Sequence, residues 1–291
     1  MPIRVTTEPS LNELFTAEAV RARGGRPVAG MFLSSGDPTA AEICAGAGLD
    51  YLLIDAEHAP LSLESIQSQL RVIAGTGTLA LVRVPALDEV IIKQVLDLGA
   101  QNVLVPMVHT AEDAQAAVRA MHYPPRGVRG VGSALARSGR WNRTAGYLQD
   151  AGAQVTLLVQ VESATAVENA AEIAAVDGVD GIFIGPSDLS ATMGLIGQQA
   201  HPDVVAAVKT VIAEVKAAGK VVGVNAFVEA HAREYVQAGA DFVNVGADVA
   251  LLARGSEALA DTWCPDPGQG PGPGSDAAAG SGAAGRTAST P

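Results

Sequence analysis

Three ionisable side chains follow one short apolar run of this sequence. The run occupies 51–54, and Asp55, Glu57 and His58 come directly after it in the stretch LIDAEHAP. A carboxylate that orients an imidazole makes a general base that operates near neutral pH. A polar loop before a helix, with a solvated histidine, has the same composition. For Asp55 and His58 both interpretations therefore stay open at this point.

Two further carboxylates follow later apolar runs. Glu162 ends the run at 155–162, and Asp188 comes shortly after the run at 181–186. If these runs are neighbouring strands, the two carboxylates can converge on one point. Carboxylate oxygens with water suit a hard cation such as Mg²⁺ or Mn²⁺. Each residue also stands where a helix is expected to begin, so helix capping is the alternative role.

Arg83 is the one charged residue inside an apolar run. It is flanked by Val82 and Val84 in the stretch LVRVP. A buried guanidinium needs an anion as its partner, because an unpaired buried charge is costly. That anion is either a substrate or a carboxylate of the protein, in a structural ion pair.

The lysines argue against one kind of carbonyl chemistry. All four fall within predicted helices or just before a strand, at Lys93, Lys209, Lys216 and Lys220. None is placed to form a Schiff base with a carbonyl substrate. If the protein acts on a carbonyl compound, a metal ion must therefore stabilise the electrons that the reaction releases.

Eight candidate strands, each built on an apolar run, alternate with amphipathic helical patterns along the chain. The candidate strands occupy 28–33, 51–55, 79–84, 102–107, 155–162, 181–186, 221–226 and 242–246. Repeated strand–helix units with apolar strands predict a parallel sheet, and eight of them favour a closed (β/α)8 TIM barrel. An open doubly wound sheet is the alternative, but no G-x-G-x-x-G follows the first run. In a barrel the strand ends meet at one face, where Gln160, Asn225 and Asn244 also lie.

Two segments fall outside this pattern. The connection at 121–154 is too long for an ordinary loop and contains five arginines, which indicates a functional or interfacial insertion. The segment 264–291 is rich in Gly, Pro, Ala and Ser and is expected to be disordered. The sequence therefore predicts one barrel domain over 1–263, with an insertion at 121–154, and a disordered C-terminal tail.

The composition argues against several classes of protein. A net charge of −12 disfavours binding to nucleic acid phosphates. The two cysteines, Cys44 and Cys264, cannot form a disulfide framework, which favours a reducing compartment. The N-terminal stretch has no signal-peptide core, and no apolar run is long enough to span a membrane. We therefore expect a cytoplasmic protein with no nucleic-acid or membrane partner.

Several phrases of the sequence resemble the HpcH/HpaI aldolase family. They are LLIDAEHAP, LVRVP, IKQVLDLGAQNVLVPMV, PPRGVRGVGSALARSGRWNR, LVQVES, GVDGIFIGPSDLSATMG and GADFVNVGADVALLARG. Members of that family are class II, metal-dependent pyruvate aldolases of the phosphoenolpyruvate/pyruvate barrel superfamily. The order and the spacing of the phrases agree across the whole expected barrel.

The resemblance implies a role for each of the residues introduced above. Glu162 and Asp188 match the family's metal ligands, for a divalent cation such as Mg²⁺, Mn²⁺ or Co²⁺. His58 matches the catalytic base and Asp55 the carboxylate that orients it. Arg83 matches the arginine that contacts the substrate carbonyl.

The resemblance also implies roles for supporting residues and for the assembly. Gln160 matches a residue beside the bound pyruvate moiety, and Glu57 one that holds metal-bound water. The backbone at Pro186, Ser187 and Asp188 matches the segment that cradles the substrate carboxylate at a helix N-terminus. The insertion resembles a segment that reaches a neighbouring subunit's active site in a homohexamer, a dimer of trimers.

The activity that the resemblance implies is the reversible cleavage of a 4-hydroxy-2-oxo acid. The expected substrate is 4-hydroxy-2-oxoheptanedioate, which yields pyruvate and succinate semialdehyde in aromatic compound catabolism. A 2-dehydro-3-deoxyglucarate-type sugar-acid aldolase is the nearest alternative. A citrate-lyase-like acyl-CoA lyase is a more distant one, because the sequence has no evident basic patch for the phosphates of coenzyme A. A non-enzymatic scaffold would keep the fold without a metal-chelating mouth.

Overall fold

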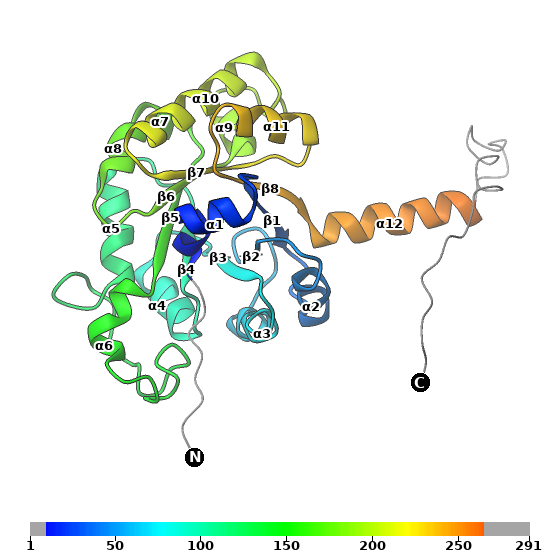
Figure 1. Ribbon diagram of the computed structural model, residues 1–291. Helices are drawn as coiled ribbons and strands as arrows, with labels where there is room; N and C mark the ends of the chain where they lie inside the picture. The colour runs from blue at the N-terminus through cyan, green and yellow to red at the C-terminus, as the bar shows by residue number, and fades with distance from the viewer. Residues whose placement is uncertain (1–9, 265–291) are drawn as a thin grey trace. The chain divides into compact units, whose positions relative to one another are not determined.

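The strands form a closed parallel barrel. The computed structural model describes residues 10–264, and each strand pairs with the next along the chain while β8 pairs with β1 (Figure 1). The strands are β1 (Val28–Leu33), β2 (Tyr51–Asp55), β3 (Leu79–Arg83), β4 (Asn102–Val105), β5 (Thr156–Val161), β6 (Gly181–Ile184), β7 (Val221–Asn225) and β8 (Phe242–Ala247). The predicted barrel is therefore confirmed, and the open-sheet alternative is excluded.

Helices follow the strands and surround the barrel in Figure 1. They are α2 (Pro38–Ala45), α3 (Leu63–Ile73), α4 (Glu89–Asp97), α5 (Ala111–Met121), α7 (Ala164–Glu168), α8 (Ala170–Ala175), α9 (Pro186–Thr192), α10 (Pro202–Ala217) and α11 (Glu229–Gln237). Polar side chains cap several of them; Ser62, for example, accepts a hydrogen bond from the Ser65 N–H at the start of α3. Among residues 10–264, no helix is long and apolar enough to cross a membrane.

The chain divides into two compact units, 1–249 and 250–291. Of the second unit, the structure describes residues 250–264, most of which belong to α12 (Asp248–Trp263). The tail that the sequence predicts to be disordered lies outside the described residues, apart from Cys264. The predicted domain boundary at 263 stays a prediction.

Apolar side chains fill the barrel and the layer around it. Tyr51 and Phe242 lie inside the barrel, whereas Leu52 faces outward and belongs to the core beneath the helices. Gly30 and Gly223 make room for the two rings: a Cβ atom at Gly30 would clash with the ring of Tyr51, and one at Gly223 would clash with the ring of Phe242. The barrel is therefore a packed core, and polar chemistry must lie at its ends.

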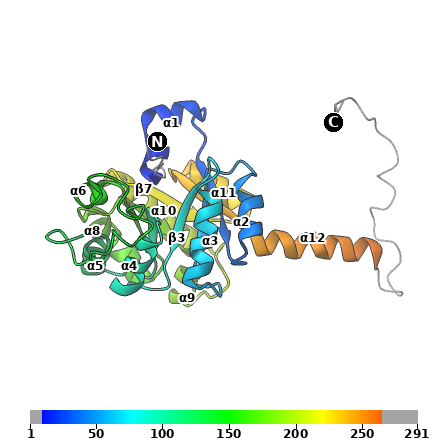
Figure 2. The same cartoon turned by 90° about the horizontal axis from the view of Figure 1, so that it is seen from below.

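The N-terminal end of the barrel is covered by the short helix η1 (Leu11–Phe15). Leu11 is buried among the side chains inside the barrel, and its N–H donates to Oδ1 of Asn102. The next helix is α1 (Ala17–Ala22), and Figure 2 shows α1 and α9 at opposite ends of the barrel. A substrate therefore has access to the barrel at its C-terminal end.

The insertion packs against the end of α4. It contains α6 (Tyr147–Asp150) and η2 (Ala151–Ala153). Two of its arginines are buried: Arg129 donates to Asp97 at 2.9 Å, and Nη1 of Arg137 donates to the Leu98 carbonyl at 3.3 Å. These contacts join the insertion to its own barrel, while its role at a subunit interface stays a prediction.

Candidate active site

Polar side chains gather at the C-terminal end of the barrel because the strands alternate. Leu81 of β3 faces the interior, so Arg83, two positions later, faces it as well and ends the strand above the apolar core. The same alternation directs Asp55 on β2 and Gln160 on β5 inward. With Glu162, which follows β5, these residues are almost completely buried.

Arg83 is held by two carboxylates. Asp55 accepts hydrogen bonds from Nε and Nη2 of Arg83, both at 2.9 Å, and Nη1 lies 2.9 Å from Oε2 of Glu57. Asp55 and Arg83 are register partners on β2 and β3, so strand pairing itself brings the carboxylate to the guanidinium. The guanidinium carbon also lies 4.9 Å from the centre of the Phe32 ring. The structural ion pair considered for Arg83 is therefore present, and it fixes the orientation of the guanidinium.

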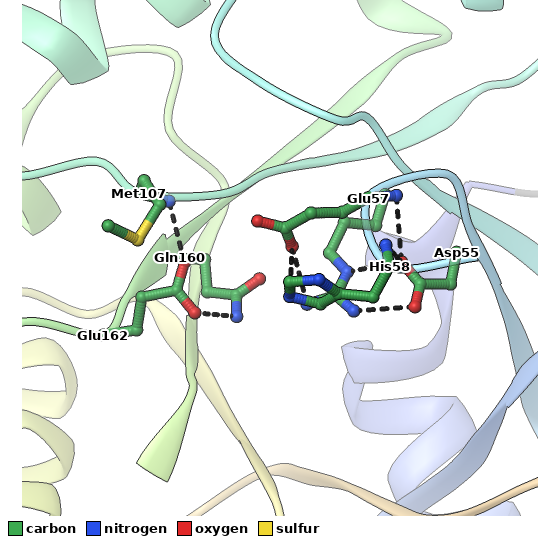
Figure 3. Close-up of polar contacts among 7 residues, drawn as sticks. Asp55, Glu57, His58, Met107, Gln160 and Glu162 are labelled. Carbon is green, nitrogen blue, oxygen red and sulfur yellow. Dashed lines mark hydrogen bonds and ion pairs between the residues drawn. The ribbon is translucent and has the colours of Figure 1, made fainter. Parts of the chain in front are cut away.

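The structure places Asp55 on Arg83 and not on the imidazole of His58. The one atom of His58 that donates to the Asp55 carboxylate is the backbone nitrogen, at 3.3 Å. The imidazole Nε2 faces Oε2 of Glu57 instead, at 3.6 Å, and the His58 side chain is 62% exposed (Figure 3). Asp55 ends β2 opposite Arg83, whereas His58 follows three residues later, in a turn outside the sheet. The expected pairing of the Asp55 carboxylate with the His58 imidazole is therefore not present, because strand register places Asp55 opposite Arg83.

Glu162 belongs to a second group of polar contacts, separate from the first in Figure 3. Its Oε1 accepts the Met107 N–H at 2.8 Å, and its Oε2 accepts a hydrogen bond from the Gln160 amide. Burial raises the pKa of Glu162 to about 7, against the opposing effect of the Met107 hydrogen bond, and the negative charges of Glu57 and Asp188 raise it further. At neutral pH Glu162 is therefore poised between its protonated and charged forms.

Met107 reaches Glu162 through an uncommon backbone conformation. Its φ angle is 53°, in the left-handed region that non-glycine residues seldom occupy. The residue follows β4, and this conformation directs its N–H toward the Glu162 carboxylate. The sequence offered no signal for this contact, because any residue type provides a backbone N–H.

Glu57 connects the arginine to the histidine. Its half-buried carboxylate lies beside both Arg83 and His58. Burial has the largest effect on the pKa of Glu57 and raises it, although the positive charges of Arg83 and His58 act in the opposite direction.

Neither Glu162 nor Asp188 caps a helix with its side chain. At the start of α7 the cap is Ser163, whose Oγ accepts from the Ala166 N–H. Helix α9 begins after Gly185 without a side-chain cap, and Asp188 lies in its first turn. The capping alternative is therefore not what the structure contains, and both carboxylates are available for another ligand.

A cavity of about 310 Å³ opens at the C-terminal end of the barrel. It is lined by Phe32, His58, Arg83, Gln160, Phe183, Gly185, Ser187, Asp188 and Asn225. Five of these residues were predicted as site residues from the sequence: His58, Arg83, Gln160, Ser187 and Asp188. Of the other predicted residues, Asp55 and Glu57 contact Arg83, Glu162 contacts Gln160, and Pro186 begins α9.

The remaining lining residues received no role from the sequence. Phe32 and Phe183 belong to apolar strands, where an aromatic residue reads as ordinary core. Asn225 did have a signal, since it is a polar residue at the end of a strand.

The comparison with known families decides what kind of protein carries this site. A family model described as HpcH/HpaI aldolase/citrate lyase matches residues 28–255, which includes every strand of the barrel. The chain belongs to the HpcH/HpaI aldolase/citrate lyase family. The family and the lyase class expected from the sequence are thereby confirmed.

Relatives within the family agree in sequence and in structure. A 4-hydroxy-2-oxo-heptane-1,7-dioate aldolase of Salmonella dublin is 50% identical over 238 residues, which are 82% of this chain and 90% of the relative. A family member from Burkholderia cenocepacia J2315 has a crystal structure with a TM-score of 0.78 and 43% identity, over 81% of this chain and 95% of the other. For an HpcH/HpaI aldolase from Desulfitobacterium hafniense DCB-2 the TM-score is 0.77 and the identity 32%, over 88% and 99%.

The donor set at the mouth of this family barrel fits a divalent cation. Glu162 is buried and has no ion-pair partner within residues 10–264, while Glu57 and Asp188 add negative charge around it. A buried carboxylate of this kind either takes up a proton or pairs with a cation. The described residues contain no group of three or more His, Cys, Asp or Glu arranged to hold a metal ion. Two carboxylates would leave the other coordination positions of a hard cation to water and substrate.

Proposed function

We propose that this protein is a divalent-metal-dependent pyruvate aldolase that cleaves 4-hydroxy-2-oxoheptanedioate reversibly into pyruvate and succinate semialdehyde, in aromatic compound catabolism. The choice of substrate is supported by relatives at 50% identity that are named for that acid. The chemistry is supported by one juxtaposition: Arg83, held by two carboxylates, shares the barrel mouth with Glu162, a buried carboxylate without an ion-pair partner among the described residues.

In this proposal Glu162 and Asp188 hold the cation, with Mg²⁺, Mn²⁺ and Co²⁺ as the candidates. A bound divalent cation supplies Lewis-acid stabilisation of the negative charge that develops on a 2-oxo acid. Gln160 donates to Glu162 and so fixes the orientation of that carboxylate beside the substrate. Glu57, whose carboxylate also faces the mouth, is the residue proposed to bind water of the cation.

Arg83 stabilises the substrate carbonyl oxygen. Asp55 accepts hydrogen bonds from two of the five guanidinium N–H groups, and Nη1 forms an ion pair with Glu57, so N–H groups remain that can donate to a ligand. Negative charge develops on the carbonyl oxygen when the bond between carbons 3 and 4 breaks and its electron pair passes toward the 2-oxo group. Because the two carboxylates already hold the guanidinium in place, the charge forms beside a donor that does not have to move.

His58 takes the proton of the hydroxyl on carbon 4. Its imidazole lines the cavity, and Glu57 is the carboxylate that faces it. Loss of that proton allows the carbon–carbon bond to break and the aldehyde to leave, and protonation of carbon 3 then gives pyruvate. Asp55 acts in this scheme by positioning Arg83.

The substrate carboxylate is proposed to bind at the start of α9. Pro186 begins that helix, and the N–H groups of Ser187 and Asp188 follow in a first turn that no side chain caps. We also propose a homohexamer, a dimer of trimers, in which the insertion at 121–154 contributes to the active site of a neighbouring subunit. The support for this assembly is the likeness of the insertion to the family's interfacial segment.

The test is an assay of pyruvate release from 4-hydroxy-2-oxoheptanedioate. EDTA should abolish release, and Mn²⁺, Co²⁺ or Mg²⁺ should restore it. Treatment with borohydride and pyruvate should leave the mass of the protein unchanged, since no lysine of the barrel forms a Schiff base. Full activity in EDTA, or a covalent pyruvate adduct, would contradict the metal-dependent mechanism.

A further inference from the structure

One histidine near the proposed cation site has no role in the proposed chemistry. His109 lies in the loop that follows β4, and it does not line the active-site cavity. Its Nδ1 lies 2.8 Å from Oγ of Ser163, the residue next to Glu162 in the chain. The carbonyl oxygen of His109 also accepts a hydrogen bond from the Asn169 side chain, at 2.8 Å. His109 therefore joins the loop after β4 to the segment that carries Glu162.

The hydroxyl of Ser163 can meet the imidazole and cap a helix at the same time. Ser163 is buried, and its Oγ accepts the Ala166 N–H at 3.1 Å at the start of α7. A serine hydroxyl is one donor and also an acceptor, so its hydrogen can point to Nδ1 of His109. The contact between His109 and Ser163 is therefore compatible with the cap of α7.

The same loop contains a residue in a strained backbone conformation. Met107, two positions before His109, has a φ angle of 53° and donates its N–H to Oε1 of Glu162 (Figure 3). Such conformations persist when the surrounding structure over-determines them. The Met107 side chain is 43% exposed, so its own packing contributes little to that restraint. The neighbouring residues of the loop must therefore supply it.

The two residues that follow in the loop restrain this conformation. Val108 is completely buried, and its N–H donates to the Gln160 carbonyl at 3.3 Å, which is long for such a bond. His109 adds the shorter contact to Ser163. Without the imidazole, the loop would lose the side-chain hydrogen bond that ties it directly beside Glu162.

We propose that His109 is a positioning residue of the cation site. Through Ser163 it holds the loop so that the Met107 N–H stays on Glu162, and the carboxylate is oriented before a cation binds. This inference rests on the proposed metal-dependent aldolase function. Groups that orient a metal ligand commonly change metal affinity when they are removed. Loss of the imidazole should therefore weaken cation binding more than it lowers the activity of the loaded enzyme.

The experiment measures Mn²⁺ binding to the full chain without substrate, from the electron paramagnetic resonance signal of free Mn²⁺. His109→Ala should raise the Kd for Mn²⁺ by about tenfold. The kcat for pyruvate release at saturating Mn²⁺ should stay within about twofold of that of the unaltered protein, because the defect lies in binding. A Kd that is unchanged within about twofold would overturn the proposal.

A conservative variant and a double variant test the bond itself. His109→Asn places an amide atom where histidine has Nδ1, so it should bind Mn²⁺ nearly as tightly as the unaltered protein. An Asn variant as weak as His109→Ala would overturn the proposal. Ser163→Ala removes the partner, and His109→Ala should add no further loss in that background, since both changes break one bond. Additive losses would also overturn the proposal.

Thr110→Ala is the matched control in the same loop. Thr110 accepts the Asp113 N–H at 3.1 Å and caps α5, so this change loosens the helix and leaves the contact between His109 and Ser163 in place. It should lower stability toward urea but leave the Kd for Mn²⁺ unchanged. An equal rise of the Kd in Thr110→Ala would mean that general loosening of the loop sets the affinity, and it would overturn the proposal.

The unaltered protein distinguishes this inference from the function on which it rests. If it binds Mn²⁺, Glu162→Gln abolishes that binding and His109→Ala leaves the Kd unchanged, the role of His109 alone is overturned. If the unaltered protein does not bind Mn²⁺, the metal-dependent aldolase proposal is overturned, and the inference with it.

Discussion

Two groups of carboxylates lie at the same end of this barrel, and they differ in whether a positive charge of the protein faces them. Asp55 and Glu57 share the guanidinium of Arg83, at 2.9 Å from each. Within residues 10–264, the donors that Glu162 meets are neutral, namely the Met107 N–H and the Gln160 amide. The first group contains its own cation, whereas the second has none among the described residues and is neutral only when Glu162 is protonated. In the proposed function, the first group positions the guanidinium of Arg83, and the second group binds a metal ion from solution.

The largest effect is expected from removing the cation of the first group. Arg83→Ala should lower kcat by about a thousandfold, because it removes the donor at the developing charge. It should also lower the free energy of unfolding by about 3 to 5 kcal/mol, since it leaves Asp55 buried without its partner. Steady-state assays and urea unfolding measure the two effects. Arg83→Lys is the matched control, because it keeps the charge and much of the stability but loses the bidentate contact. An active Arg83→Ala would contradict the assigned role.

The next largest effect is expected from removing the imidazole of His58, which faces Glu57. His58→Ala should lower pyruvate release by about a hundredfold, the usual size of a general-base contribution. Exchange of the pyruvate methyl protons should fall much less, because that reaction has no carbon-4 hydroxyl. Equal losses in the two assays would show that His58 does not act at the hydroxyl. Because the imidazole contacts Glu57 and not Asp55, Glu57→Gln should reduce release through His58 as well.

The second group, around Glu162, should affect the pH dependence of stability. The pKa of Glu162 is raised from 4.5 to about 7, so the folded protein binds this proton more tightly than the unfolded chain. In metal-free protein its contribution is therefore fully present below about pH 4.5 and is lost as pH rises through about 7, up to about 3 kcal/mol. Urea unfolding between pH 5 and 8 measures the loss.

Glu162→Gln is the control for that pH dependence. The amide cannot ionise, so the metal-free variant should lose less stability over the same range, and it should no longer bind Mn²⁺ in calorimetry. An unchanged pH profile would mean that Glu162 is already charged in the fold and that its surroundings supply the missing partner.

The smallest effect should come from the backbone that holds Glu162. Met107 has φ 53°, a conformation that β-branched residues tolerate worst. Met107→Ile should therefore lower the free energy of unfolding by about 1 to 2 kcal/mol. Met107→Gly keeps the N–H that Glu162 accepts and should stay within about 1 kcal/mol of the unaltered protein, because relief of strain offsets the greater freedom of the unfolded chain. A Met107→Ile variant as stable as the unaltered protein would argue against strain at this position.

Much of the site could be predicted from the sequence. The positions of Arg83, Glu162 and Asp188 at or near the ends of apolar runs were sufficient to place them at one end of a barrel, because the C-terminal ends of parallel strands meet at one face. What the sequence left open was the group that each side chain contacts: a metal or a helix N-terminus for the two carboxylates, and a substrate or a protein carboxylate for Arg83. The absence of side-chain capping by Glu162 and Asp188, and the ion pair of Arg83, became visible only in three dimensions.

The sequence by itself determined the barrel, since the apolar periodicity of eight strands admits few other ways to bury them, and it determined which residues stand at the strand ends. The tertiary structure decided which of those residues meet. Asp55 and His58 are three positions apart, yet register places the Asp55 carboxylate on Arg83, 28 residues away along the chain. Partner choice depends on strand register and on the directions of side chains across the barrel, and neither is encoded in local spacing.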